Sequence, residues 1–202
     1  LKRALATEGA SLVQGLVNLA SDAQRGRISM CDESAFEVGR NLAMTPGSVV
    51  YRNELIELLQ YAPTTERVHR RPLVIVPPCI NKYYVLDLSP GNSLVRWAVA
   101  EGHTVFMISW RNIPPELGCT TWDDYLEKGV LAAIEVARDV GTENVNALGF
   151  CVGGTLLASA LAVPAARNEP PVASVTLLTT MLDFADPGDI GVYVTREALA
   201  AR

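Results

Sequence analysis

Histidine is scarce in this sequence of 202 residues, which contains only two, and its four cysteines form no C-x-x-C pair. A structural zinc site needs several such ligands at close spacing, so we expect no metal site. The 17 lysines and arginines are scattered, apart from the adjacent pair Arg70 and Arg71, and with a net charge of −5 no basic face suited to nucleic acid is expected. The N-terminal residues lack the apolar run of a signal peptide, so we expect a cytoplasmic protein with reduced thiols.

Charge is absent from the segment 144–166, whose length would be enough to span a bilayer. The segment contains three glycines and Pro164, however, and a buried strand followed by a buried helix explains it better. We therefore expect no transmembrane segment. The hydrophobic share of 49% is high for a soluble domain and is typical of a buried parallel sheet.

The first 71 residues are predicted to form a mainly helical N-terminal region that packs beside a core domain. Within residues 1–30, leucines recur at helical spacing, at Leu5, Leu12, Leu16 and Leu19. Residues 31–71 are mixed and polar, with short apolar pieces. The sequence begins and stops within helix-prone stretches, so we expect it to be a fragment of a longer protein.

From residue 72 to residue 202, short apolar runs alternate with helical patterns. We predict strands at 73–76, 104–110, 144–150 and 174–180, and helices at 92–101, 121–140 and 154–163. Asn92 is expected to cap the first of these helices, and Gly141 is expected to end the second. Strands that alternate with helices need crossover connections, so residues 72–202 are predicted to form an α/β domain with a parallel sheet.

The stretch ALGFCVGG at 147–154 has the spacing G-x-C-x-G between a predicted strand and a predicted helix. A nucleophile elbow requires this context, because its reactive residue sits at the tip of a sharp strand-to-helix turn. Gly149 and Gly153 flank Cys151 where a Cβ atom would press the strand against the helix. The helix N-terminus would also favour the thiolate form of Cys151. The alternative is a buried structural cysteine beside glycines that allow close helix packing.

An acyl-transfer site also needs two backbone N–H donors for the oxyanion that develops on the carbonyl oxygen. The N–H of Val152, directly after the cysteine, is the first candidate. The second donor of this turn type comes from a loop after an earlier strand, here residues 77–82. We expect it to be the N–H of Ile80, with its neighbours possible. Cys79 and Asn81 belong to the same loop and are expected to line the pocket, Cys79 most simply as a small apolar residue.

A cysteine nucleophile needs a histidine base that is oriented by an acid, and no histidine follows Cys151 in the sequence. His69 and His103 both precede predicted strands, which places them at the amino edge of the sheet. The active site of such a sheet lies at the carboxyl edge, about 15–20 Å away. We therefore expect both histidines to be surface or structural residues.

Three acidic residues do follow the last predicted strand, at Asp183, Asp186 and Asp189. A solvated loop is the simpler interpretation of them, because a triad acid normally follows a later strand. The base and the acid would then lie in sequence that is absent here, and we expect the chain on its own to be inactive.

Several long motifs closely resemble the class I poly(3-hydroxyalkanoate) polymerases, the bacterial polyester synthases. They include GFCVGGTLLASALAV, PPCINKYYVLDLSP, GHTVFMISWRNIP and SVTLLTTMLDFADPGDI. The likeness runs from about Asp32 to Ile190. It implies an α/β-hydrolase-type core, incomplete here, preceded by a helical N-terminal region. It also implies that Cys151 is the nucleophile, while the aspartate and histidine of the family lie further toward the C-terminus and have no matching positions.

The same resemblance implies (R)-3-hydroxyacyl-CoA, mainly 3-hydroxybutyryl-CoA, as the substrate and a polyester granule in the cytoplasm as the product. It implies no cofactor, and a homodimer for the intact enzyme. A thiol suits this chemistry, because Cys151 would exchange one thioester for another and keep the acyl group activated. Two alternatives stay open. The first is a cysteine hydrolase of the same fold, such as a thioesterase or a dienelactone-hydrolase-like enzyme. The second is a non-catalytic module in which residues 1–71 bind a partner or a granule.

Overall fold

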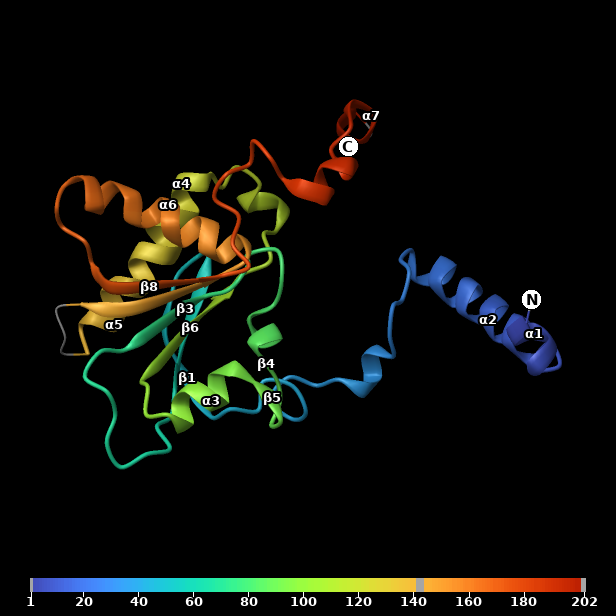
Figure 1. The fold of residues 1–202 in the computed structure, drawn as a ribbon. Coiled ribbons are helices and arrows are strands. Elements are labelled where there is room, and N and C mark those ends of the chain that lie inside the picture. Colours follow the sequence, from blue (N-terminus) through green and yellow to red (C-terminus); the bar gives the residue numbers. More distant parts are fainter. Residues whose placement is uncertain (1, 141–143, 201–202) are drawn as a thin grey trace. The chain divides into compact units, whose positions relative to one another are not determined.

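The computed structural model describes residues 2–140 and 144–200. The chain divides into two compact units, Leu1–Asn41 and Leu42–Arg202, each of which is described by itself (Figure 1). The division falls about thirty residues before the predicted boundary at 71. Residues 42–71, which the prediction placed in the N-terminal region, group with the second unit.

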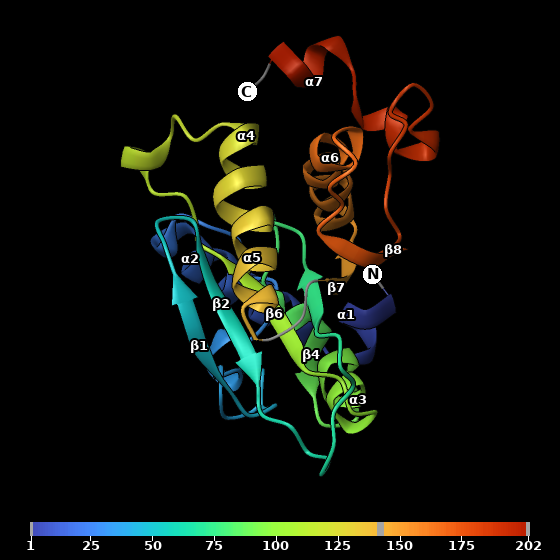
Figure 2. The same cartoon turned by 90° about the vertical axis from the view of Figure 1, so that its left-hand side faces the viewer.

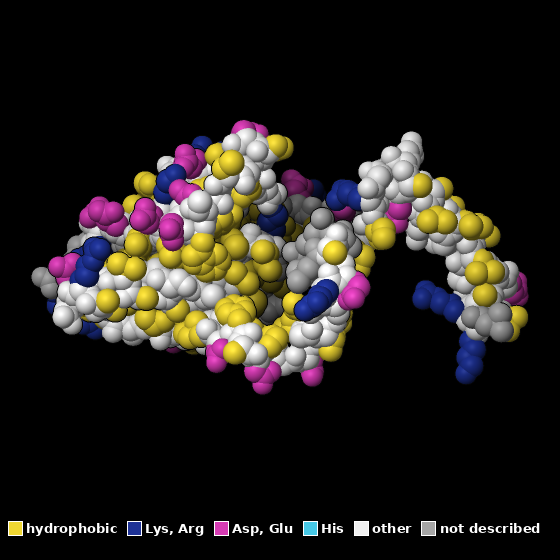
Figure 3. Space-filling view, turned by 90° about the horizontal axis from the view of Figure 1, so that it is seen from above, with side chains coloured by type: hydrophobic (Ala, Val, Ile, Leu, Met, Phe, Trp, Pro, Cys, Tyr) yellow, Lys and Arg dark blue, Asp and Glu magenta, His cyan; other side chains and the backbone are white. Residues whose placement is uncertain are grey.

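The first unit is helical, as the leucine spacing predicted. It contains the helices α1 (Lys2–Ala6) and α2 (Ala10–Arg25) and a 3₁₀ turn at Glu33–Ala35. Helix α2 ends at Gly26, whose φ of 68° lies in the left-handed region. No residue of α2 is buried, and its large apolar side chains lie more than half exposed along the helix (Figure 3). This unit thus presents an apolar helix surface that its own residues do not cover.

The second unit is built on a six-stranded sheet of order β1-β2-β6-β3-β7-β8. The strands are β1 Gly47–Arg52, β2 Ile56–Tyr61, β3 Leu73–Val76, β6 Val105–Trp110, β7 Val145–Phe150 and β8 Val172–Leu178. The four strands predicted after residue 72 are confirmed, with β8 lying two residues earlier than predicted, and they pair with one another in parallel. The sheet is mixed, however, because β1 and β2 join it through antiparallel pairings.

Helices cover both faces of the sheet, as Figures 1 and 2 show. They are α3 Leu94–Ala100, α4 Trp122–Asp124, a π-helical stretch Tyr125–Leu131, α5 Ala132–Arg138 and α6 Val152–Ala166. Ser93 caps α3 in place of the predicted Asn92, since its hydroxyl accepts from the N–H of Arg96 at 2.9 Å. The predicted end of the next helix, Gly141, lies outside the described residues. Within the described ranges, no helix combines the length and the apolar character needed to cross a membrane.

Short elements complete the unit. They are a 3₁₀ turn at Tyr83–Leu86, β4 Asp87–Ser89, β5 Asn92–Ser93, 3₁₀ turns at Pro115–Leu117 and Gly188–Tyr193, and α7 Arg196–Ala200. Strands β4 and β5 pair with each other in a small separate sheet.

Side chains along the central strands alternate between two hydrophobic clusters. Val74 and Val76 join one cluster with residues of α5 and α6, while Ile75 joins the other with residues of α3. This alternation is the two-residue period of a strand that is buried on both faces. It explains why these strands are nearly continuous apolar runs in the sequence.

Among the described residues of this unit, Asp87 has a buried carboxylate. Asp87 is only 2% exposed and accepts hydrogen bonds from the hydroxyls of Thr45 at 2.7 Å and Ser93 at 2.6 Å. Its second oxygen accepts from the N–H of Thr45 at 3.2 Å. These bonds fasten the segment before β1 to the turn that leads into α3.

We expect Asp87→Ala to lower the free energy of unfolding by about 2–4 kcal/mol, because three donors would lose a charged acceptor in a buried site. Urea unfolding of the protein measures this loss. Asp123→Ala is the matched control, since that carboxylate is exposed at the start of α4. Equal stability of the two variants would contradict the assigned role of Asp87.

Candidate active site

The chain turns sharply at Cys151, between the end of β7 and the start of α6. Cys151 has φ 54° and ψ −125°, a backbone conformation that non-glycine residues rarely adopt. Its N–H donates to the carbonyl of Leu178 at the end of β8, at 2.9 Å. Its own carbonyl accepts from the N–H groups of Gly154 and Thr155 at 2.9 and 3.3 Å. The geometry is that of a strand-to-helix elbow with a free, half-buried thiol at its tip.

The two predicted glycines make this turn sterically possible. A Cβ atom on Gly149 would lie 2.4 Å from the Cα of Gly154, so strand and helix touch there through their backbones. A Cβ atom on Gly153 would lie 2.1 Å from the carbonyl oxygen of Val76 and 2.6 Å from that of Pro77. Gly153 therefore sets how closely the elbow approaches the loop after β3.

The loop Pro77–Lys82 lies at the same edge of the sheet as Cys151, because β3 and β7 are parallel neighbours. The N–H of Asn81 donates to the carbonyl of Pro78 at 3.3 Å and closes a tight turn around Cys79 and Ile80. Ile80 is 79% exposed, and within the described residues its N–H has no hydrogen-bond partner. Val152 opens α6, so its N–H has no partner inside the helix. Both predicted oxyanion donors are thus backbone N–H groups that have no hydrogen-bond partner among the described residues, and both lie at the same edge of the sheet.

Cys79 and Asn81 have different surroundings in this loop. Cys79 packs against the hydrophobic cluster on the α5–α6 side of the sheet, and burial raises the pKa of its thiol. A small apolar residue is the role that the sequence predicted for it. Asn81 is exposed, and its side-chain oxygen accepts from the N–H of Lys82 at 2.8 Å. The Lys82 ammonium in turn donates to the side-chain oxygen of Asn112, which follows β6, at 2.6 Å.

Three residues that sequence analysis did not single out also shape the site. The indole N–H of Trp110 donates to the carbonyl of Pro77 at 2.8 Å inside the protein. The side chain of Thr180 occupies the space that a Cβ atom on Gly154 would need. Such a Cβ atom would lie 2.0 Å from the Oγ1 of Thr180. The Thr155 hydroxyl donates to the carbonyl of Met181 at 2.8 Å. A buried tryptophan needs a partner for its N–H, and that need was the one available signal for Trp110.

Both histidines lie at the amino edge of the sheet, as predicted. His69 precedes β3 and His103 precedes β6, with their ring centroids 4.7 Å apart. Burial, followed by the neighbouring His69, lowers the pKa of His103. The Nδ1 atom of His103 is buried without a hydrogen-bond partner among the described residues.

The three downstream acids lie in an exposed segment after β8, in agreement with a solvated loop. Asp183 accepts from the N–H of Ala185, and Asp186 from the N–H of Gly188, at 2.9 and 3.1 Å. Such short-range bonds stabilise turns, and neither acid contacts a histidine. No cluster of three or more potential metal ligands occurs in the described ranges.

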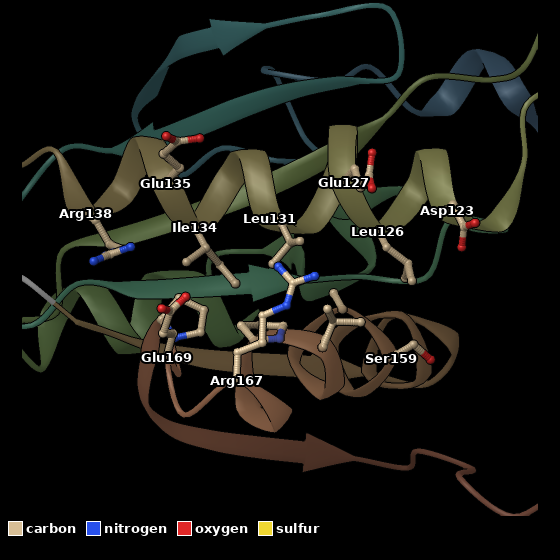
Figure 4. Close-up of a pocket in the computed structure, with 14 residues that line it drawn as sticks. Asp123, Leu126, Glu127, Leu131, Ile134, Glu135, Arg138, Ser159, Arg167 and Glu169 are labelled. Carbon is tan, nitrogen blue, oxygen red and sulfur yellow. The ribbon is translucent and has the colours of Figure 1, made fainter.

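A hollow of about 460 Å³ lies away from Cys151, between the second half of α6 and the α4–α5 stretch (Figure 4). Its lining combines apolar residues such as Leu126, Leu131 and Ile134 with acidic side chains on the rim. Arg167 reaches across it toward Leu131 (Figure 4). None of the predicted site residues lines it, so this hollow is not the candidate active site.

Comparison with known proteins identifies close relatives in sequence. The family model for the N-terminus of poly-beta-hydroxybutyrate polymerase (PhaC) matches residues 1–98. The chain is 60% identical to the poly(3-hydroxyalkanoate) polymerase subunit PhaC of Cupriavidus necator, over 92% of this chain and 32% of that protein. It is 43% identical to the subunit of the same name from Rhizobium meliloti, over 96% of this chain and 32% of that protein. The chain thus spans about a third of the length of these curated relatives.

Solved structures resemble the fold at much lower identity. Carboxyl esterase 2 of Tuber melanosporum matches with a TM-score of 0.53 and 13% identity, over 85% of this chain and 56% of that one. A fungal esterase from Rhizomucor miehei matches with a TM-score of 0.50 and 17% identity, over 87% and 54%. At these identities the likeness shows the fold alone, and it confirms an α/β-hydrolase core.

Proposed function

The chain belongs to the family of poly(3-hydroxyalkanoate) polymerases, and on that basis we propose that it carries the nucleophile and the oxyanion donors of such an enzyme. The proposed reaction joins (R)-3-hydroxyacyl groups, mainly 3-hydroxybutyryl, from CoA thioesters into a polyester. The observation that carries the proposal is a free thiol at a positive-φ turn between strand and helix, with uncommitted amides at the same sheet edge.

In the first step, the Cys151 thiolate attacks the thioester carbonyl of the substrate. A bond forms between the sulfur and the acyl carbon, the bond to the CoA sulfur breaks, and CoA leaves as a thiolate that takes up a proton. The N–H groups of Val152 and Ile80 would hold the negative charge that develops on the carbonyl oxygen. Because one thioester replaces another, the acyl group keeps its reactivity.

In the second step, the 3-hydroxyl of another acyl unit attacks the acyl-enzyme. A carbon–oxygen bond forms, the bond to the Cys151 sulfur breaks, and the hydroxyl proton passes to a base. The pocket must admit this hydroxyl and exclude water, since water would release the free acid instead. A serine at position 151 would form an ordinary ester after the first step and would lose this activation.

The base must come from elsewhere than the two histidines, which lie at the amino edge of the sheet. We propose that a full-length polymerase supplies a histidine and an aspartate from other sequence, and that the 202 residues alone are inactive. The mechanism requires no cofactor. We further propose that the full-length enzyme acts as a homodimer at polyester granules in the cytoplasm, as the resemblance implies.

A cysteine hydrolase of the same fold, such as a thioesterase, is the alternative, and the products distinguish the two. We expect a full-length polymerase carrying this sequence to release CoA from 3-hydroxybutyryl-CoA and to form polymer in matching amounts. CoA release with free 3-hydroxybutyrate would support the hydrolase. A non-catalytic role would be favoured if Cys151→Ala caused no loss of function.

A further inference from the structure

A hollow of about 450 Å³ lies at the amino edge of the sheet, opposite the edge that carries Cys151. Its lining consists of His69, Arg70, Arg71, His103 and Asn146. Among the described residues, every side chain of this lining can donate a hydrogen bond from nitrogen, and none is a carboxylate. Such a lining is unusual in a chain whose net charge is −5. The hollow is therefore suited to a negatively charged group.

The two arginines of the lining have no counter-charge in the part of the chain that the structure describes. Neither Arg70 nor Arg71 makes a hydrogen bond or an ion pair there. By contrast, Arg27, Arg40 and Arg52 each pair with a glutamate. A guanidinium group donates two parallel hydrogen bonds to an oxyanion, so two adjacent unpaired arginines favour a ligand with several charged oxygens.

The histidine pair adds donors that depend on protonation. The Nε2 of His69 lies 3.1 Å from the carbonyl oxygen of Glu101, to which its N–H donates. The buried Nδ1 of His103 has no partner among the described residues. The pKa of His103 is lowered first by burial and then by His69, against a smaller opposite effect of Glu101. An anion in the hollow would supply the charge that stabilises the protonated rings.

Asn146 provides a neutral donor in a fixed position. Its main-chain N–H donates to the carbonyl of Pro72 at 2.8 Å, which holds it at the start of β7. Its side-chain oxygen accepts from the hydroxyl of Ser174 at 2.9 Å. The amide nitrogen is therefore left with N–H groups that no described residue accepts.

We propose that this hollow binds a tetrahedral oxyanion with two negative charges, of the phosphate class, through Arg70, Arg71, Asn146 and the two histidines. The two charges match the two guanidinium groups, and the several oxygens match donors that come from three separate segments of the chain. The free ion and a phosphomonoester share this chemistry. The site does not depend on the acyl transfer proposed for the opposite edge.

Histidine NMR of this 202-residue chain gives a direct test, because the chain contains only two histidines. Sulfate keeps its double charge between pH 5 and 8, so any pH dependence of its binding belongs to the protein. At constant ionic strength, we expect sulfate to shift the ring-proton signals of both histidines, to raise the pKa of His103, and to bind more tightly at pH 5.5 than at pH 7.5. Arg70→Ala and Arg71→Ala should each weaken binding about tenfold. Arg111→Ala removes the same charge at the carboxyl edge and should change nothing.

Binding measurements with different ligands identify the source of the anion. Binding of inorganic phosphate and of adenosine monophosphate, without binding of adenosine, would assign the site to the phosphate group itself. Binding of adenosine monophosphate alone would assign it to a phosphomonoester. The proposal is overturned if none of these anions moves the His103 signal, or if the shift survives in the double variant Arg70→Ala/Arg71→Ala.

Discussion

Replacing Cys151 by alanine in a full-length polymerase with this sequence is expected to lower CoA release from 3-hydroxybutyryl-CoA about ten-thousand-fold or more. The variant keeps the elbow, because alanine fits wherever cysteine does, but it has no atom that can form the acyl-enzyme. Removal of a covalent nucleophile in comparable acyl-transfer enzymes has effects of about this size. The measurement is steady-state CoA release, together with mass spectrometry of the protein for the bound acyl group.

Cys151→Ser should retain only a small part of the activity, because an alkoxide is harder to form than a thiolate and the resulting ester is less reactive. Cys119→Ala is the matched control, since that thiol is free and exposed and does not belong to the elbow. It should be as active as the unchanged enzyme. Polymer formation by Cys151→Ala at more than a few per cent of the normal rate would exclude this mechanism.

Local sequence patterns were sufficient to predict the central strands and helices, because each of these elements is partly or fully buried and has its own hydrophobic periodicity. Strands β3, β6 and β7 are short apolar runs, which is the pattern of a strand covered on both faces. Strand β1 was missed because nearly all its residues are exposed and give no alternation. At the start of β2, the buried residues Leu55, directly before the strand, and Ile56 and Leu58 within it have a spacing that suits a helix as well as a strand.

The same distinction holds for the candidate site: its local features could be predicted from the sequence, and its contacts between distant residues could not. The elbow could be predicted because strand, turn and helix are consecutive in the sequence, and because its glycines have a steric reason. The hydrogen bond from Trp110 to Pro77 spans 33 residues, and Thr180, which lies close to Gly154, follows the neighbouring strand β8. Such contacts cannot be predicted from the hydrophobic periodicity of the sequence, since they depend on which strands become neighbours in the sheet.

These distant contacts lead to a second large expected effect. Gly153→Ala should lower the free energy of unfolding by about 3 kcal/mol, because its Cβ would overlap main-chain oxygens that no rotamer change can move. The added carbon would lie 2.1 Å from the carbonyl oxygen of Val76. The loop that follows Val76 would have to shift, and a displacement of about 1 Å at a reacting group costs on the order of a hundredfold in rate.

Gly154→Ala provides a comparison with Gly153→Ala, because the three atoms nearest to its added Cβ all belong to the side chain of Thr180. Thr180→Gly removes the atoms in conflict and should restore much of the stability lost in Gly154→Ala, whereas it should not rescue Gly153→Ala. Urea unfolding of the single and double variants, with CoA release by the full-length enzyme, measures both effects. Gly91→Ala serves as the control, since no atom lies within 4 Å of its added Cβ. If Gly153→Ala behaved like this control, the close contact between the elbow and the loop Pro77–Lys82 would not exist, and the N–H groups of Val152 and Ile80 could not act together on one oxygen.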